Sequence, residues 1–407
     1  MRRPAALAAI AAVAAAAVWF AIRSYQQDFA AYWTAALARS AGLDPYVNYA
    51  GAGGALAPWD GVALFRHSRF LYPPLVADLF RPLLVLPYLA AKALFTVAML
   101  AAWIAAGLVV TDDRPGRTVF FVAGALFFPL YRHLERGQID LLILLLLALA
   151  WRARGQPVAA GAALALAGAI KPAFLGLLPI VWALGRGRTV LAALAVGAGV
   201  LGMTALVDGP ARLRAYVTQV LPRAALYGEG GTEEMLLPAE RRPAQDVQDD
   251  GEEIRVQRRT YRMSIGDAPA AASLPRLLAP EGPTPATARL PFFVAIAGLT
   301  ALAARQRRRA DPPVAALIFW ATAVACVVTS PAGWVMGLVV ALPLVTLGAT
   351  LLVAGRLDRR LAAAGALAWA AAALPAPFSG FPALAGVALI GLAVAAVLTD
   401  PATGRPA

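Results

Sequence analysis

Two charged residues stand beside apolar segments, where charge is costly. Asp28, followed by Phe29, comes just after the first apolar run, and Lys171, followed by Pro172, separates two others. Taking an ionisable side chain into hydrocarbon costs on the order of 3 kcal/mol or more, so such residues usually face a cavity, a partner or a substrate. A carboxylate can act as a general base and a lysine can receive a phosphate. The two residues therefore point to a charged, lipid-borne substrate.

Each of these residues also has an ordinary structural interpretation. Residues 28–39 carry Phe29, Tyr32 and Trp33 at helical spacing, which predicts an amphipathic helix along the outer membrane interface. Asp28 could simply be the N-cap of that helix. Lys171 could extend its side chain to the interface, as lysines near helix ends do.

A dense polar cluster and three short motifs lie between other apolar runs. Residues 131–140 contain two arginines, a histidine, an amide and two carboxylates, namely Arg132, His133, Glu135, Arg136, Gln138 and Asp140. Such a cluster predicts phosphate or sugar contacts, with lipid headgroups as the alternative. The short motifs are Asp44-Pro45-Tyr46, Tyr72-Pro73-Pro74 and Ser330-Pro331 with Trp334. The paired prolines also fit a rigid loop, and Trp334 fits an ordinary interface residue.

The composition identifies an integral membrane protein. The 407 residues are 60% hydrophobic and 14% charged, with a mean hydropathy of +0.67, whereas soluble domains carry about 25% charged residues. The net charge of +13 reflects short arginine clusters between apolar runs, which set orientation and do not indicate nucleic acid. The single Cys326 and the two histidines, His67 and His133, show no metal-site spacing.

The apolar runs predict twelve transmembrane helices, because a crossing needs about 20 apolar residues. They lie near 4–22, 84–110, 118–131, 138–151, 157–170, 172–184, 189–207, 290–304, 313–329, 333–354, 361–375 and 383–399. If the twelve spans alternate in direction, all the arginine clusters lie on the same side of the membrane. The positive-inside rule identifies that side as the cytoplasm. Both termini then lie in the cytoplasm as well. The first run could instead be a signal peptide, although it is long enough for an anchor.

This topology places two large segments outside the cytoplasm. Residues 23–83 contain Asp28 and form the first, with interfacial helices and a catalytic role. Residues 208–289 form the second, which is polar, rich in proline and charged with both signs, so we expect part of it to be disordered.

The motifs together resemble glycosyltransferase family 87 (formerly DUF2029), the polyprenol-phosphate-mannose-dependent alpha-mannosyltransferases of the integral-membrane GT-C class. Asp140 departs from the resemblance, because the family more often shows Gly-Gln-x-Asn. The matching motifs are Asp28-Phe29 with Tyr32, Gly42-Leu43-Asp44-Pro45-Tyr46, Tyr72-Pro73-Pro74-Leu75, Gly137-Gln138-Ile139-Asp140, Lys171-Pro172 and Ser330-Pro331 with Trp334.

The resemblance implies an all-α polytopic membrane protein with a single GT-C domain over residues 1–407, located in the inner membrane of a bacterium. It implies a polyprenyl-phosphate mannose donor, a glycolipid or envelope glycan acceptor, inversion at the sugar, and neither metal nor cofactor. Asp28 would be the catalytic base, and the donor phosphate would contact Lys171, Arg136, His67 and His133. The substrate contacts would be Tyr32, Asp44, Tyr46, Tyr72, Gln138, Asp140, Ser330 and Trp334.

Three alternatives stay open at this point. The donor could carry arabinofuranose or another pentose. A lipid or sugar transporter would use Lys171 and the broken span as a midplane site, although the polar residues gather at span ends. A structural envelope protein would leave Asp28 as a helix cap.

Overall fold

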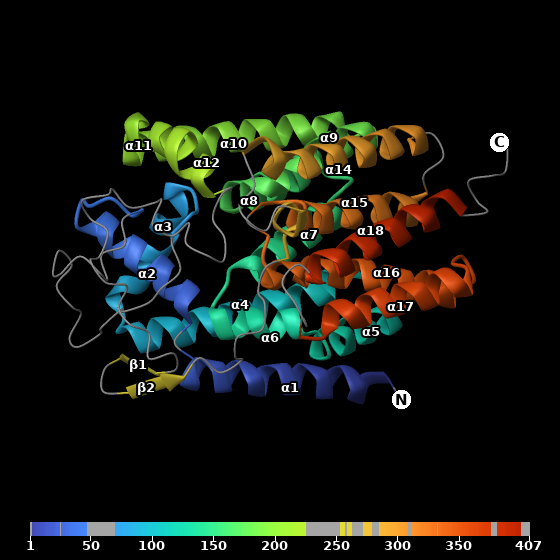
Figure 1. The fold of residues 1–407 in the computed structure, drawn as a ribbon, viewed down its shortest axis with the longest axis horizontal. Helices are drawn as coiled ribbons and strands as arrows, with labels where there is room; N and C mark the ends of the chain where they lie inside the picture. Colours follow the sequence, from blue (N-terminus) through green and yellow to red (C-terminus); the bar gives the residue numbers. More distant parts are fainter. Residues whose placement is uncertain are drawn as a thin grey trace.

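The protein is a bundle of α-helices, most of which lie side by side along the long axis of the molecule (Figure 1). The computed structural model describes residues 2–24, 26–46, 70–224, 253–256, 259–262, 272–278, 285–307, 311–331, 333–375 and 381–399. Helix α1 begins and α18 ends at the same end of the bundle, and α2, α3 and α11 gather at the other end (Figure 1).

Within the described residues, six helical segments are long and apolar enough to cross a membrane. They lie in α1 (Arg2–Arg23), α4 (Tyr88–Val110), α10 (Gly187–Asp208), α14 (Pro285–Gln306), η7 (Val335–Ala341) with α16 (Leu342–Val353), and α18 (Phe381–Thr399). The protein is therefore a polytopic membrane protein, but the prediction of twelve spans is too high.

The remaining predicted spans are helical but short. Helix α7 (Asp140–Arg152) has 13 residues and α8 (Pro157–Ile170) has 14, so each is about 20 Å long, well below the roughly 30 Å of hydrocarbon. Helix α15 (Pro312–Val328) is buried along almost its whole length. Apolar sequence in these helices serves contacts between helices, which a hydropathy count cannot distinguish from contact with lipid.

Prolines account for several of the breaks. The predicted span 118–131 is wrong as one helix, because α5 (Arg114–Ala125) ends before α6 (Phe128–Arg136), and Pro129 stands in the first turn of α6. Pro172 likewise starts the 3-10 helix η3 (Pro172–Gly176), which leads into α9 (Leu177–Ala183). The last predicted short span is α17 (Arg359–Ala373).

Three of the connections that follow apolar helices lie together at the end of α7. Arg152, at the end of α7, forms an ion pair with Asp112 at 3.3 Å, and Arg186 donates a hydrogen bond to the carbonyl of Arg154 at 2.5 Å. Asp140 begins α7 and Arg152 ends it. The polar cluster at residues 131–140 and the arginine loops therefore lie at opposite ends of this helix.

The smaller elements belong mainly to the two predicted outer segments. The first contains α2 (Gln27–Ser40), α3 (Pro74–Phe80) and η2 (Arg81–Val85). The second contains α11 (Pro210–Ala215), the π-helix η4 (Tyr216–Val220), α12 (Leu221–Ala224), α13 (Leu274–Leu278) and a hairpin of β1 (Glu253–Val256) with β2 (Arg259–Arg262). The predicted disordered centre of this segment falls largely outside the described residues.

Helix α2 corrects one prediction. Its helical state was expected, but its position on the membrane surface was not right, because 11 of its 14 residues are buried. Phe29 lies within about 6 Å, between ring centroids, of Trp33, Phe80, Tyr88 and Phe95. The apolar and aromatic residues of α2 therefore pack against protein on nearly every side.

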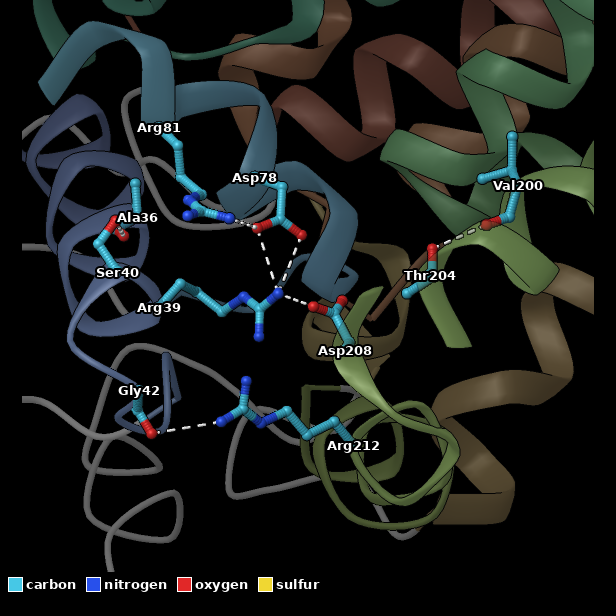
Figure 2. A network of polar contacts seen from close by, with 10 residues as sticks. All are labelled: Ala36, Arg39, Ser40, Gly42, Asp78, Arg81, Val200, Thr204, Asp208 and Arg212. Atoms are coloured by element: carbon cyan, nitrogen blue, oxygen red, sulfur yellow. Dashed lines mark hydrogen bonds and ion pairs between the residues drawn. The ribbon is translucent and has the colours of Figure 1, made fainter. Parts of the chain in front are cut away.

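A buried charge network fixes the far end of α2. Arg39 donates from Nη2 to both carboxylate oxygens of Asp78 on α3, at 3.1 and 3.2 Å, and forms an ion pair with Asp208 at the end of α10 (Figure 2). The side chains of Arg39 and Asp208 are 4% and 0% exposed. This network, which we call the Arg39 clamp, ties together α2, α3 and α10.

Candidate functional site

Asp28 is held at the start of α2 by a residue far along the chain. Gln26 occupies the N-cap position with a positive φ of 56°, and Asp28 lies in the first turn. The Nε2 of Gln138 donates a hydrogen bond to Oδ2 of Asp28 at 2.7 Å. Asp28 is 5% exposed. The alternative that Asp28 is the N-cap of this helix is therefore wrong, although a first-turn carboxylate still benefits from the helix dipole.

The amide of Gln138 is shared with two tyrosines. Its Oε1 lies 3.1 Å from the hydroxyl of Tyr32 and 3.0 Å from that of Tyr72, and the two hydroxyls lie 2.9 Å apart. Tyr32 is on α2, one turn after Asp28, and Tyr72 precedes α3. Three segments that are distant in sequence thus meet at one amide.

Gly137 makes this meeting possible. It ends α6 with a φ of 70°, and its N–H and that of Gln138 both donate to the carbonyl of His133. A Cβ at this position would stand 2.8 Å from Cβ of Phe29 and 2.9 Å from Cβ of Gln26. Glycine therefore satisfies both the left-handed turn and the close approach of the α6–α7 turn to α2.

Buried polar residues that sequence reasoning did not single out fix the entry to α2. Lys92 on α4 is fully buried and its Nζ donates to the carbonyl of Ser24 at 2.6 Å. The amide of Gln26 donates to Oγ1 of Thr96 and to the carbonyl of Leu134, both at 2.9 Å. A lysine inside a predicted span was the available signal for this role, because such a charge needs a partner.

The second predicted centre is an ion pair. Nζ of Lys171 lies 2.7 Å from Oδ1 of Asp140, and the two side chains are 20% and 1% exposed. Lys171 ends α8 in an extended conformation before Pro172, which turns its side chain toward the start of α7. Asp140 is only two residues after Gln138. The contacts of Asp28 and Lys171 therefore converge on one turn of the chain.

His133 is part of the framework of this turn. Its Nε2 accepts a hydrogen bond from the backbone N–H of Leu141 at 3.2 Å, and its side chain is fully buried. Burial lowers its pKa from 6.5 to about 4, with Lys171 acting in the same direction and Asp140 opposing it. The imidazole is therefore neutral near pH 7, where it supports the first turn of α7. Its predicted contact with a donor phosphate stays a prediction.

The two arginines of α6 differ in their partners. Arg132 forms a buried ion pair with Glu135 at 2.7 Å. Arg136 is only partly buried, and in the described part of the chain no group accepts a hydrogen bond from its Nε. Nε of Arg132 also has no acceptor there, so the two arginines differ in the ion pair of Arg132 and in the greater exposure of Arg136, which makes Arg136 the better candidate for an anionic ligand.

The other predicted contacts lie around this centre. The hydroxyl of Tyr46 donates to the carbonyl of Tyr72 at 3.0 Å, and Asp44 accepts from the N–H of Tyr46 at 2.9 Å, which closes a local turn. Ser330 and Trp334 connect α15 to η7, and η7 carries Gly337, where a Cβ would stand 3.7 Å from Oδ1 of Asp140. His67 lies outside the described residues.

This arrangement has the groups that displacement of a phosphate leaving group needs, namely a base and cations. The carboxylate of Asp28 is held by a neutral amide, Arg136 ends α6 beside the same turn, and Lys171 at the end of α8 pairs with Asp140 at the start of α7. Across the residues that the structure describes, no three His, Cys, Asp or Glu side chains group as a metal site. Asp28, Lys171 and Arg136 are candidates for acid–base and phosphate chemistry.

Comparison with known proteins identifies part of the chain. Residues 70–237 match the model of glycosyltransferase family 87. No curated protein matches the chain. The matched residues include Tyr72, Gln138, Asp140 and Lys171, whereas Asp28 and Trp334 lie outside them.

Proposed function

Because residues 70–237 match the model of glycosyltransferase family 87, we propose that the protein is an inverting mannosyltransferase that uses a polyprenyl-phosphate donor. The acceptor is a glycolipid or a glycan of the cell envelope. The observation that carries the proposal is the convergence of Asp28 and Lys171 on the turn at Gln138 and Asp140. Asp28 as the base and Lys171 as the cation both contact residues of this short turn, as expected if they act on the same substrate.

In the proposed reaction, an acceptor hydroxyl attacks the anomeric carbon from the face opposite the phosphate. The bond from this carbon to the phosphate oxygen breaks through an oxocarbenium-like transition state, and its electron pair leaves with polyprenyl phosphate. Asp28 takes the proton of the hydroxyl. Lys171 and Arg136 stabilise the negative charge that develops on the phosphate.

The proposal places this reaction on the outer face of the bacterial inner membrane. The arginine loops meet at the end of α7 remote from Asp140, and arginine-rich loops stay in the cytoplasm. In a GT-C arrangement the polyprenyl chain of the donor stays in the bilayer while its phosphate and sugar reach the surface. A site at the outer ends of the helices would be within reach of the phosphate and sugar of such a donor.

The test is transfer by the purified protein in lipid nanodiscs, with glycolipids from an envelope extract as acceptor. Polyprenyl-phosphate mannose labelled in the sugar should yield labelled glycolipid and an equal amount of polyprenyl phosphate. Faster transfer from a pentose donor would overturn the choice of mannose. In vesicles, label that crosses the bilayer without a covalent product would identify a carrier and contradict the proposal. Glycolipids that accumulate in a deletion strain identify the acceptor.

A further inference from the structure

We propose that Gln138 is a positioning residue that acts through Asp28. Its amide, oriented by the hydroxyls of Tyr32 and Tyr72, directs an N–H at the carboxylate and favours the ionised form that a general base needs. The inference deepens the proposed function and rests on it. It replaces direct substrate contact as the role of Gln138.

The orientation of the amide follows from what surrounds it. Oε1 lies within 3.1 Å of two hydroxyls, and Nε2 lies 2.7 Å from Oδ2 of Asp28. A rotated amide would set its oxygen against an ionised carboxylate oxygen, where neither atom has a hydrogen to donate. The observed orientation therefore favours a negative charge on Asp28, because a donated N–H stabilises the ionised carboxylate more than the neutral acid.

The tyrosines remain hydrogen-bond donors at any physiological pH. Burial raises the pKa of both Tyr32 and Tyr72 well above 10, and the negative charges of Asp28 and Asp140 add to this effect. Each hydroxyl has one hydrogen, so Oε1 receives both directly, or receives one from Tyr72 while Tyr32 donates to Tyr72. In either arrangement at least one hydroxyl holds the amide oxygen away from Asp28.

Burial makes this arrangement effective. Asp28 is 5% exposed and Gln138 is 6% exposed, so water competes little for the hydrogen bond between them. The charge of Asp28 also acts on Arg132, which is paired with Glu135. The amide is thus a neutral hydrogen-bond donor, and its loss should make the ionised form of Asp28 less favourable.

The test is the pH dependence of kcat/KM for Gln138→Glu and Gln138→Leu. In Gln138→Glu two carboxylates share one site, so protonation of one is favoured and the acid limb should move upward by at least about one pH unit. Gln138→Leu should lower kcat/KM by about 10- to 100-fold near pH 7, with part of the loss recovered at higher pH. The role of the tyrosines in orienting the amide is tested by the double variant Tyr32→Phe with Tyr72→Phe. Its acid limb should also move upward, by less than that of Gln138→Glu.

Gln156→Glu is the matched control, because it adds the same charge at an exposed N-cap and should leave the profile unchanged. If the acid limb of Gln138→Glu does not shift while Asp28→Asn is inactive, the inference about Gln138 is wrong and the proposed function stands. A raised KM at an unchanged limb in Gln138→Leu restores substrate contact as the role and also overturns it. Full turnover by Asp28→Asn would instead show that Asp28 is not the general base, which contradicts the proposed function. Failure of the inference and failure of the proposed function therefore give different results. If Gln138→Leu does not fold, the nearly isosteric Gln138→Glu decides.

Discussion

Gly137 and Phe29 approach so closely that a methyl group at Gly137 would lie 2.8 Å from Cβ of Phe29. This contact joins the turn that carries Gln138 to the helix that carries Asp28. The distance from the base to its amide partner is therefore set by a glycine, and it should be sensitive to a single carbon atom.

Gly137→Ala should lower both stability and transfer rate. The left-handed φ of 70° costs alanine about 1–2 kcal/mol, and the crowded Cβ adds about 1–3 kcal/mol. Gly355→Ala is the control, because Gly355 has a φ of 68° and nothing within 4 Å of its Cβ position. Thermal unfolding should show the larger loss at Gly137, and only that variant should lose activity. Equal losses of stability with normal transfer would contradict a spatial role for Gly137.

Asp140→Asn should strengthen donor binding. The change removes a negative charge 2.7 Å from Nζ of Lys171 but keeps an oxygen that can accept its hydrogen bond. A phosphate at this site would then gain about 1 kcal/mol, or about 5- to 10-fold in Kd. Lys171→Ala should weaken binding of the same donor. Titration with polyprenyl-phosphate mannose in the absence of acceptor measures both effects, and unchanged binding in both variants would return Lys171 to an interfacial role.

The Arg39 clamp should contribute strongly to stability. Arg39→Leu leaves the fully buried carboxylate of Asp208 without its cation, and breaking a buried pair this way costs about 3–5 kcal/mol. The double variant Arg39→Leu with Asp208→Leu should be less destabilised than Arg39→Leu. Arg152→Ala, which breaks the exposed pair with Asp112, should cost less than about 1 kcal/mol. Similar thermal midpoints for Arg39→Leu and Arg152→Ala would contradict the clamp.

His133 should make the fold sensitive to acid. Its pKa of about 4 in the folded protein lies below the value of 6.5 for an unfolded chain, so the unfolded chain binds the proton first. Stability should therefore be complete above about pH 6.5 and fall by up to about 3 kcal/mol as the pH drops toward 4. The loss between pH 7.5 and 5 should be smaller in His133→Gln. Identical losses in the two proteins would exclude His133 as the cause.

Local features of the structure were largely predictable from the sequence. Pro157 and Pro312 each stand at the start of a helix near a predicted span boundary, because proline suits the first turn. The number of membrane spans was not predictable in this way. A buried helix such as α15 has the same apolar composition as one that faces lipid.

The site itself was predictable as a set of residues but not as a set of contacts. Asp28, Gln138, Asp140 and Lys171 were all candidates, yet Asp28 and Gln138 are 110 positions apart in the sequence, and nothing in the sequence between them indicates their hydrogen bond. The pairing of Arg39 with Asp208 is equally long-range. Such contacts depend on how helices pack, and no local spacing records them.

The most direct test of the account is single-turnover transfer by Asp28→Asn. Labelled polyprenyl-phosphate mannose is bound to the purified variant, excess glycolipid acceptor is added, and the labelled product is measured over time. The control is Asp112→Asn, because Asp112 is exposed and pairs with Arg152 at the other end of α7. We predict that both variants bind the donor, that Asp112→Asn transfers the sugar at the normal rate, and that Asp28→Asn transfers none. Transfer by Asp28→Asn at the normal rate would contradict the account.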